Sequence, residues 1–152
     1  TYAPAMHMQS LEAYPFDSIL VPYNYTMMQQ PQYAHDFNAL YEMCQARGVA
    51  MQTIKGIAAR RWQDGDEEKR FSWYRPITDA DAMKRAIDFV LSRENLFINT
   101  SSDATLLERS LDAIAQPTAE VDLALLAEDA QRLGVEALFV RDVSDDVIIS
   151  AG

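Results

Sequence analysis

The chain has 152 residues, of which 49% are apolar and 24% are charged, and its formal net charge is −10. This is the composition of a globular chain long enough for one domain with a real core. The acidic balance argues against nucleic acid or an anionic membrane surface as a partner. The single cysteine, Cys44, excludes an internal disulfide. With neither a signal-peptide pattern nor an 18-residue apolar run, these features predict a cytoplasmic protein.

The first half of the chain alternates predicted helices and strands. A helix is expected over residues 3–14, and Pro15 ends it. Residues 18–22 (SILVP) are a continuous apolar run, which is typical of a strand buried on both faces. Apolar side chains then recur at helical spacing over 33–47, and residues 49–54 (VAMQTI) predict a second strand.

The connection over residues 58–77 is long and polar. Connections of this length inside compact domains are usually functional loops or disordered. Its aromatic side chains are open to two interpretations, a lid over a ligand or simple packing: Trp62, Phe71, Trp73 and Tyr74.

Two further amphipathic helices are expected in the second half. One runs from a cap at Thr78 to about Glu94. The other spans residues 118–133 and ends at Gly134. The tail, 135–152, has mixed character and either wraps the domain in part or frays.

A third strand over residues 97–100 runs into the polar segment Ser101-Ser102-Asp103 and then into a helix that starts near Ala104. A strand that ends in small hydroxyl residues and opens a helix can present backbone N–H groups to a phosphate. The simpler interpretation is that Ser102 or Asp103 caps the helix. Both interpretations stay open at this point.

Continuous apolar strands that alternate with amphipathic helices predict an α/β fold with a parallel sheet. A small doubly wound domain and a part of a (β/α)8 barrel both satisfy this order. A whole barrel needs about 250 residues, so a barrel assignment implies a part of one.

No metal site is expected. His7 and His35 are isolated from carboxylates or Cys at ligand spacing. Cys44 continues an apolar helical stripe and is interpreted as a buried structural thiol. No side chain is assigned a catalytic role.

Four segments together resemble the aldo/keto reductase family: VPYNY, RGVAMQTIKGIA, FVLSREN and FINTSSDATLLERSLDAI. The resemblance covers residues 18–115 and corresponds to the last three strands of that family's barrel. It implies the C-terminal portion of a (β/α)8 TIM barrel, with about three parallel strands and flanking helices. Residues 1–152 would then form a single partial domain, in which 118–152 are a C-terminal helix and tail.

The resemblance implies an NAD(P)-dependent oxidoreductase that reduces a carbonyl substrate by hydride transfer, with NADP or NAD as cofactor. By position in the family, the following residues would bind the cofactor: Ile54, Lys55, Gly56, Ile57, Thr100, Ser101, Ser102, Asp103, Arg109 and Ser110. Four residues would lie on the substrate side: Tyr23, Asn24, Trp62 and Trp73.

The sequence departs from the family at Leu20, Ile54 and Leu106, where many members have Gln, an aromatic residue and Arg. The family's Asp, Tyr, Lys and His tetrad would lie upstream of Thr1, so we expect this chain alone to be inactive. The alternative is a non-catalytic α/β binding or assembly module. Under either hypothesis, exposed barrel edges would favour self-association.

Overall fold

The computed structural model describes residues 3–118 and 120–140, and its centre is a three-stranded parallel sheet. The strands are β1 (Ser18–Pro22), β2 (Ala50–Ile54) and β5 (Leu96–Ile98), in the order β1-β2-β5. The parallel α/β arrangement expected from the apolar runs is confirmed. In the described part of the chain the sheet ends at β1 and β5 and does not close into a barrel.

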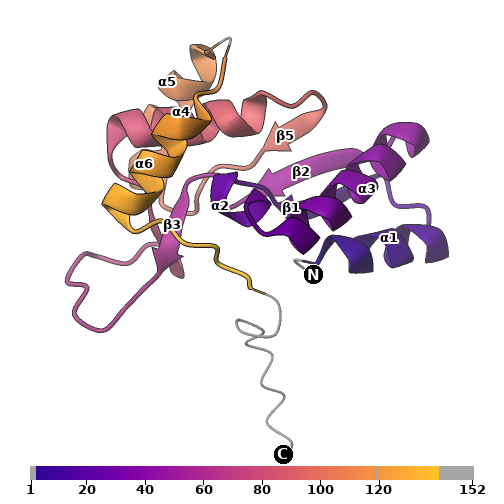
Figure 1. The fold of residues 1–152 in the computed structure, drawn as a ribbon, viewed down its shortest axis with the longest axis horizontal. Helices are drawn as coiled ribbons and strands as arrows, with labels where there is room; N and C mark the ends of the chain where they lie inside the picture. The colour runs from indigo at the N-terminus through magenta and orange to yellow at the C-terminus, as the bar shows by residue number, and fades with distance from the viewer. Residues whose placement is uncertain (1–2, 119, 141–152) are drawn as a thin grey trace, which may run out of the picture.

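Helices cover one face of this sheet (Figure 1). They are α1 (Pro4–Ala13), α3 (Pro31–Arg47) and α4 (Ala80–Leu91). Alternate strand residues point toward them, because successive side chains of a strand face opposite sides. The core between the helices and the sheet includes Ile19, Val21, Phe37, Leu40, Met51, Val90 and Leu96.

The opposite face of the sheet carries a row of side chains in register, Leu20, Gln52 and Phe97. Leu20 is 46% exposed and Phe97 is 57% exposed. No element among residues 3–118 and 120–140 therefore buries this row. Parallel sheets are normally covered on both faces, so an exposed apolar row is unusual.

Residues 55–79 contain more regular structure than the sequence predicts. Strands β3 (Ala58–Arg61) and β4 (Tyr74–Pro76) pair antiparallel as a hairpin. Arg60 donates to both carboxylate oxygens of Asp66 at 2.7 and 2.8 Å, and this fork ties the connecting loop to β3. The alternation of apolar and polar residues cannot be recognised in the sequence of strands as short as these.

Several predicted boundaries were wrong because side chains cap the helices. Asp79, not Thr78, caps α4 by accepting a hydrogen bond from the Ala82 N–H at 2.9 Å, and α4 ends at Leu91. Asp122 caps α6 (Leu123–Leu133), which therefore starts five residues later than expected. The remaining elements are α2 (Tyr25–Met28), the short η1 (Ala104–Leu106) and α5 (Leu107–Ala115).

Residues 135–140 follow α6 and run along the hairpin, where the Glu136 N–H donates to the Ala59 carbonyl at 2.7 Å. This confirms that the tail wraps the domain in part, whereas residues 141–152 lie outside the described residues. Among the described helices, none combines the length and the apolar character needed to cross a membrane.

Candidate functional site

The carboxyl ends of β1, β2 and β5 meet at one edge of the sheet, because the three strands are parallel. The segments that follow these ends contain most of the predicted site residues. Tyr23 and Asn24 follow β1, Lys55–Ile57 follow β2, and Thr100–Asp103 follow β5. In open parallel sheets and in barrels this edge is where ligands bind.

Lys55 is the cation at this edge. Its backbone is left-handed, with φ 67°, which is uncommon for a residue other than glycine. Its Nζ lies 4.7 Å from the ring centroids of both Trp73 and Tyr74. Burial lowers the pKa of Lys55 from its ordinary value. Within the described residues, no carboxylate pairs with this ammonium group.

Asn24 holds the ends of β1 and β2 together. Its Nδ2 donates to the Lys55 carbonyl at 3.0 Å, and its Oδ1 accepts from the Met27 N–H at 2.8 Å. The same side chain therefore caps α2 and supports the left-handed backbone at Lys55. Asn24 is only 5% exposed, so it acts here as a structural clamp.

Tyr74 connects the segment after β2 with the segment after β5. Its ring contacts the Lys55 ammonium, and its hydroxyl donates to Ser101 Oγ at 3.1 Å. Burial raises the pKa of Tyr74, although the hydrogen bond to Ser101 opposes the shift, so the phenol is neutral at physiological pH. The two predicted cofactor segments thus converge on one buried side chain.

The polar segment after β5 turns into a helix through its own side chains. Asp103 Oδ1 accepts from the N–H and the hydroxyl of Thr105 at 3.0 and 2.5 Å. Ser101 Oγ also accepts from the Asp103 N–H at 3.2 Å. Thr100 and Ser102 are exposed at the edge. The capping interpretation of Asp103 is confirmed, since it caps η1. Of the two exposed hydroxyl groups, that of Ser102 donates to the Phe71 carbonyl at 3.5 Å.

Three predicted site residues lie in the interior of the protein. Tyr23 is 5% exposed and stacks on Phe37, with ring centroids 4.6 Å apart. Ile57 belongs to the core under α4, and the Ser110 hydroxyl, which is also buried, donates to the Leu106 carbonyl at 2.9 Å. These side chains pack the scaffold in this structure and do not face the carboxyl edge.

The remaining predicted residues are spread around the edge. Gly56 approaches α4 closely, because a Cβ there would lie 3.3 Å from Val90 Cγ2. Ile54 ends β2 and is half-buried. Arg109 is exposed on α5, where it donates to the Thr78 carbonyl at 3.4 Å.

The two hairpin tryptophans differ in their surroundings. Trp62 Nε1 donates to the Ser72 carbonyl at 2.8 Å and closes the base of the hairpin loop. Trp73 is 48% exposed and contacts both Lys55 and Phe139. Trp62 is therefore a packing residue, and Trp73 is the residue that presents an open surface beside the lysine.

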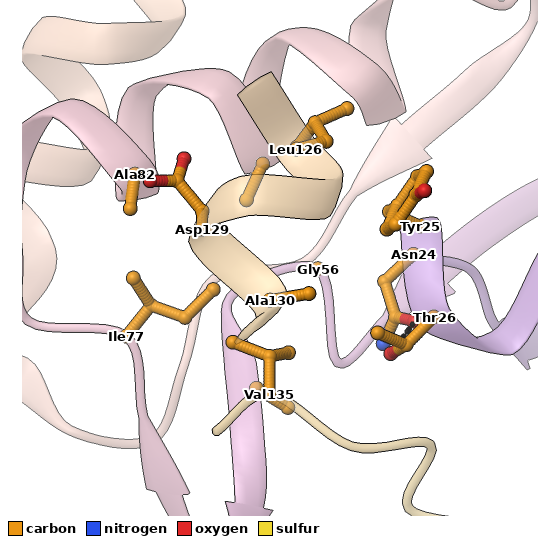
Figure 2. A pocket seen from close by; sticks show the side chains of 12 residues that line it. Asn24, Tyr25, Thr26, Gly56, Ile77, Ala82, Leu126, Asp129, Ala130 and Val135 are labelled. Carbon is orange, nitrogen blue, oxygen red and sulfur yellow. Dashed lines mark hydrogen bonds between the residues drawn. The ribbon is translucent and has the colours of Figure 1, made fainter. Parts of the chain in front are cut away.

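No sequence pattern indicated the position of α6, which lies over the same edge. Figure 2 shows Leu126, Asp129 and Ala130 of α6 on one side of a cavity and Asn24 on the other. The cavity, which Gly56 also lines, has a volume of about 30 Å³, room for no more than one or two water molecules.

Chemically, the edge offers a half-buried ammonium group, neighbouring hydroxyl groups and an open indole surface. This combination suits an anionic group such as a phosphate. The described residues contain no group of three or more His, Cys, Asp or Glu placed to hold a metal ion. No protein-family model, curated protein or solved structure matches the chain.

Proposed function

We propose that this chain is the cofactor-holding part of an NAD(P)-dependent oxidoreductase of the aldo/keto reductase type. In the complete enzyme, hydride would pass from the nicotinamide to the carbonyl carbon of a small substrate. The resemblance assigns none of that family's four catalytic side chains to this chain. Its role is therefore to bind the dinucleotide.

The observation that carries this proposal is the convergence of Lys55 and Ser101 on Tyr74. The two residues lie 46 positions apart in the sequence, yet both reach the carboxyl edge of a parallel sheet. A pyrophosphate needs a cation and hydroxyl or N–H donors from more than one segment. Lys55 would supply the cation and the exposed Thr100 hydroxyl a donor. The Ser102 hydroxyl would donate to the pyrophosphate in place of the Phe71 carbonyl.

The uncovered face of the sheet supports the proposal that this chain is a part of a barrel. The row formed by Leu20, Gln52 and Phe97 alternates with the residues that face the helices. In a closed barrel such alternate residues fill the interior in layers. The exposure of this row is what a portion of a barrel would show.

The test is a titration of the purified chain with NADPH and, separately, NADH, followed by nicotinamide fluorescence. We expect saturable binding that Lys55→Ala weakens about ten- to a hundredfold, since it removes one charge-assisted hydrogen bond. Inorganic pyrophosphate should compete with the dinucleotide.

Lys69→Ala is the matched control. Lys69 is an exposed lysine in the hairpin loop whose Nζ lies 4.8 Å from the Phe71 ring centroid. Its removal changes the net charge equally and should leave the affinity unchanged. Absence of saturable binding by a chain with native circular dichroism would contradict the proposal, as would equal weakening by both variants.

A non-catalytic assembly module is the second candidate, and the exposed row on the sheet favours it. Under this hypothesis the polar segment after β5 only caps η1, and the apolar face of the sheet binds a protein. The same titration separates the two functions, because an assembly module binds neither dinucleotide.

A further inference from the structure

The helix α6 lies across the carboxyl edge with little apolar attachment. Of its eleven residues, only Leu126 and Asp129 are buried. Leu123 is 56% exposed and Leu125 is 40% exposed. Besides the buried Leu126, Leu133 of α6 packs in part against the core under α4. This apolar burial is small beside the entropy lost on ordering the helix.

An ion-pair network supplies the rest of the attachment. Asp129 accepts from Arg85 of α4 through both oxygens, at 2.6 and 3.0 Å, and from Arg132 at 2.8 Å. Arg132 also donates to Asp79, the residue that caps α4, at 3.1 Å. The network therefore links α6 to α4 and to the cap of α4.

The same helix closes the cavity beside Gly56 and Asn24. With α6 in place, the volume of about 30 Å³ admits water but not a phosphate group together with its attached nucleoside. Any ligand that reaches the Gly56 backbone from this side must first displace Leu126 and Ala130.

We infer that α6 is a detachable cover over the carboxyl edge, fastened to α4 by Asp129 and its arginines, and that its release opens the cavity beside Gly56 and Asn24. The element has few buried apolar contacts, which is typical of the segments that open locally while the core stays folded. The ligand part of this inference rests on the proposed function, whereas the detachment itself does not.

Hydrogen–deuterium exchange of the full chain tests the detachment. Amides of α6 should exchange at least tenfold faster than those of α3, whose Phe37, Leu40 and Cys44 are fully buried. Asp129→Asn keeps the size of the side chain and removes its charge. It should speed exchange in residues 123–133 by a further tenfold, and these residues should still exchange at least tenfold faster than residues 31–47.

Glu128→Gln is the control, because Glu128 is exposed on the same helix and has no hydrogen-bond or ion-pair partner among the described residues. It should leave exchange in α6 unaltered. Protection of α6 equal to that of α3 would overturn the inference. Equal exchange of the two helices in Asp129→Asn would also overturn it, since α6 would then open only together with the whole fold.

A separate measurement tests whether α6 controls access of the ligand to the cavity. Asp129→Asn should raise the association rate of NADH several-fold in stopped-flow fluorescence, because the cover opens more often. If wild-type chain binds no dinucleotide, the proposed function fails while the exchange result still decides whether α6 detaches. If NADH binds and the rate is unchanged by Asp129→Asn, the cover does not gate this site.

Discussion

At the scale of single residues, one hydrogen bond joins Tyr74, whose ring contacts Lys55, to Ser101 in the segment after β5. The Tyr74 hydroxyl is buried, and Ser101 Oγ is its acceptor. A buried hydroxyl without a partner loses its hydration and gains no hydrogen bond, so removing the Ser101 acceptor costs more than the net value of the bond.

We therefore predict that Tyr74→Phe lowers the free energy of unfolding by about 0.5–1.5 kcal/mol. Ser101→Ala should cost about 1–3 kcal/mol, because it strands the Tyr74 hydroxyl and also removes the acceptor of the Asp103 N–H. The double variant should cost less than the sum of the two, with the difference measuring the coupling. Urea unfolding followed by far-UV circular dichroism measures all three values.

Tyr14→Phe provides the comparison for this cycle, since Tyr14 is 60% exposed and its ring lies tilted against that of Phe16. It should be neutral. Strict additivity of the two site variants would show that the Tyr74–Ser101 bond contributes nothing in solution.

At the scale of elements, the attachment of α6 depends on pH. Hydrogen bonds from Arg85, and then from Arg132, hold the pKa of Asp129 below its ordinary value against the opposing effect of burial. The pKa of Asp79 is lowered by the Ala82 N–H and by Arg132. A carboxylate with a depressed folded-state pKa stabilises the fold above its unfolded pKa, about 3.9 for Asp, and loses that contribution as the pH falls further.

We predict that Asp129→Asn lowers the melting temperature at pH 6 and that its deficit from wild type shrinks as the pH falls from 4 to 2.5. Thermal unfolding at a series of pH values measures the deficit. Glu128→Gln should follow the wild-type curve throughout. A deficit that stays constant below pH 4 would mean that Asp129 does not ionise differently in the folded and unfolded chains.

At the scale of the whole molecule, no element among residues 3–118 and 120–140 covers one face of the sheet or pairs with the outer edges of β1 and β5. Unpaired strand edges expose backbone N–H and C=O groups that can pair with another chain. Together with the exposed Leu20 and Phe97, they predict self-association of the purified chain.

The double variant Leu20→Lys, Phe97→Lys should shift the chain toward monomer, as measured by light scattering across a concentration series. The charges oppose burial of this row in an interface. Leu123→Lys, at an equally exposed position on α6, should leave the association state unchanged. Association that resists the double variant would place the contact elsewhere.

Local sequence patterns were enough to predict the three strands of the parallel sheet and the main helices, because continuous apolar runs and helical periodicity can be read along the chain. It also located Lys55, Ser101 and Asn24 at one edge, since all parallel strands end on the same side. The apolar run 18–22 and the helix over 33–47 lie where the local signal placed them.

Contacts between side chains far apart in the sequence depend on the folded chain. Tyr74 reaches Ser101 across 27 positions, and Arg85 reaches Asp129 across 44, distances over which no local pattern carries information. Tyr23 directly follows β1, the position expected of a site residue, but its ring stacks on Phe37 and is buried in the core. The helix α6 shows only an amphipathic pattern in sequence, and its place over the edge comes from the arginines that hold Asp129. The three-dimensional packing of the chain determines which buried charges pair. The position of α6 over the edge therefore could not be predicted from the sequence.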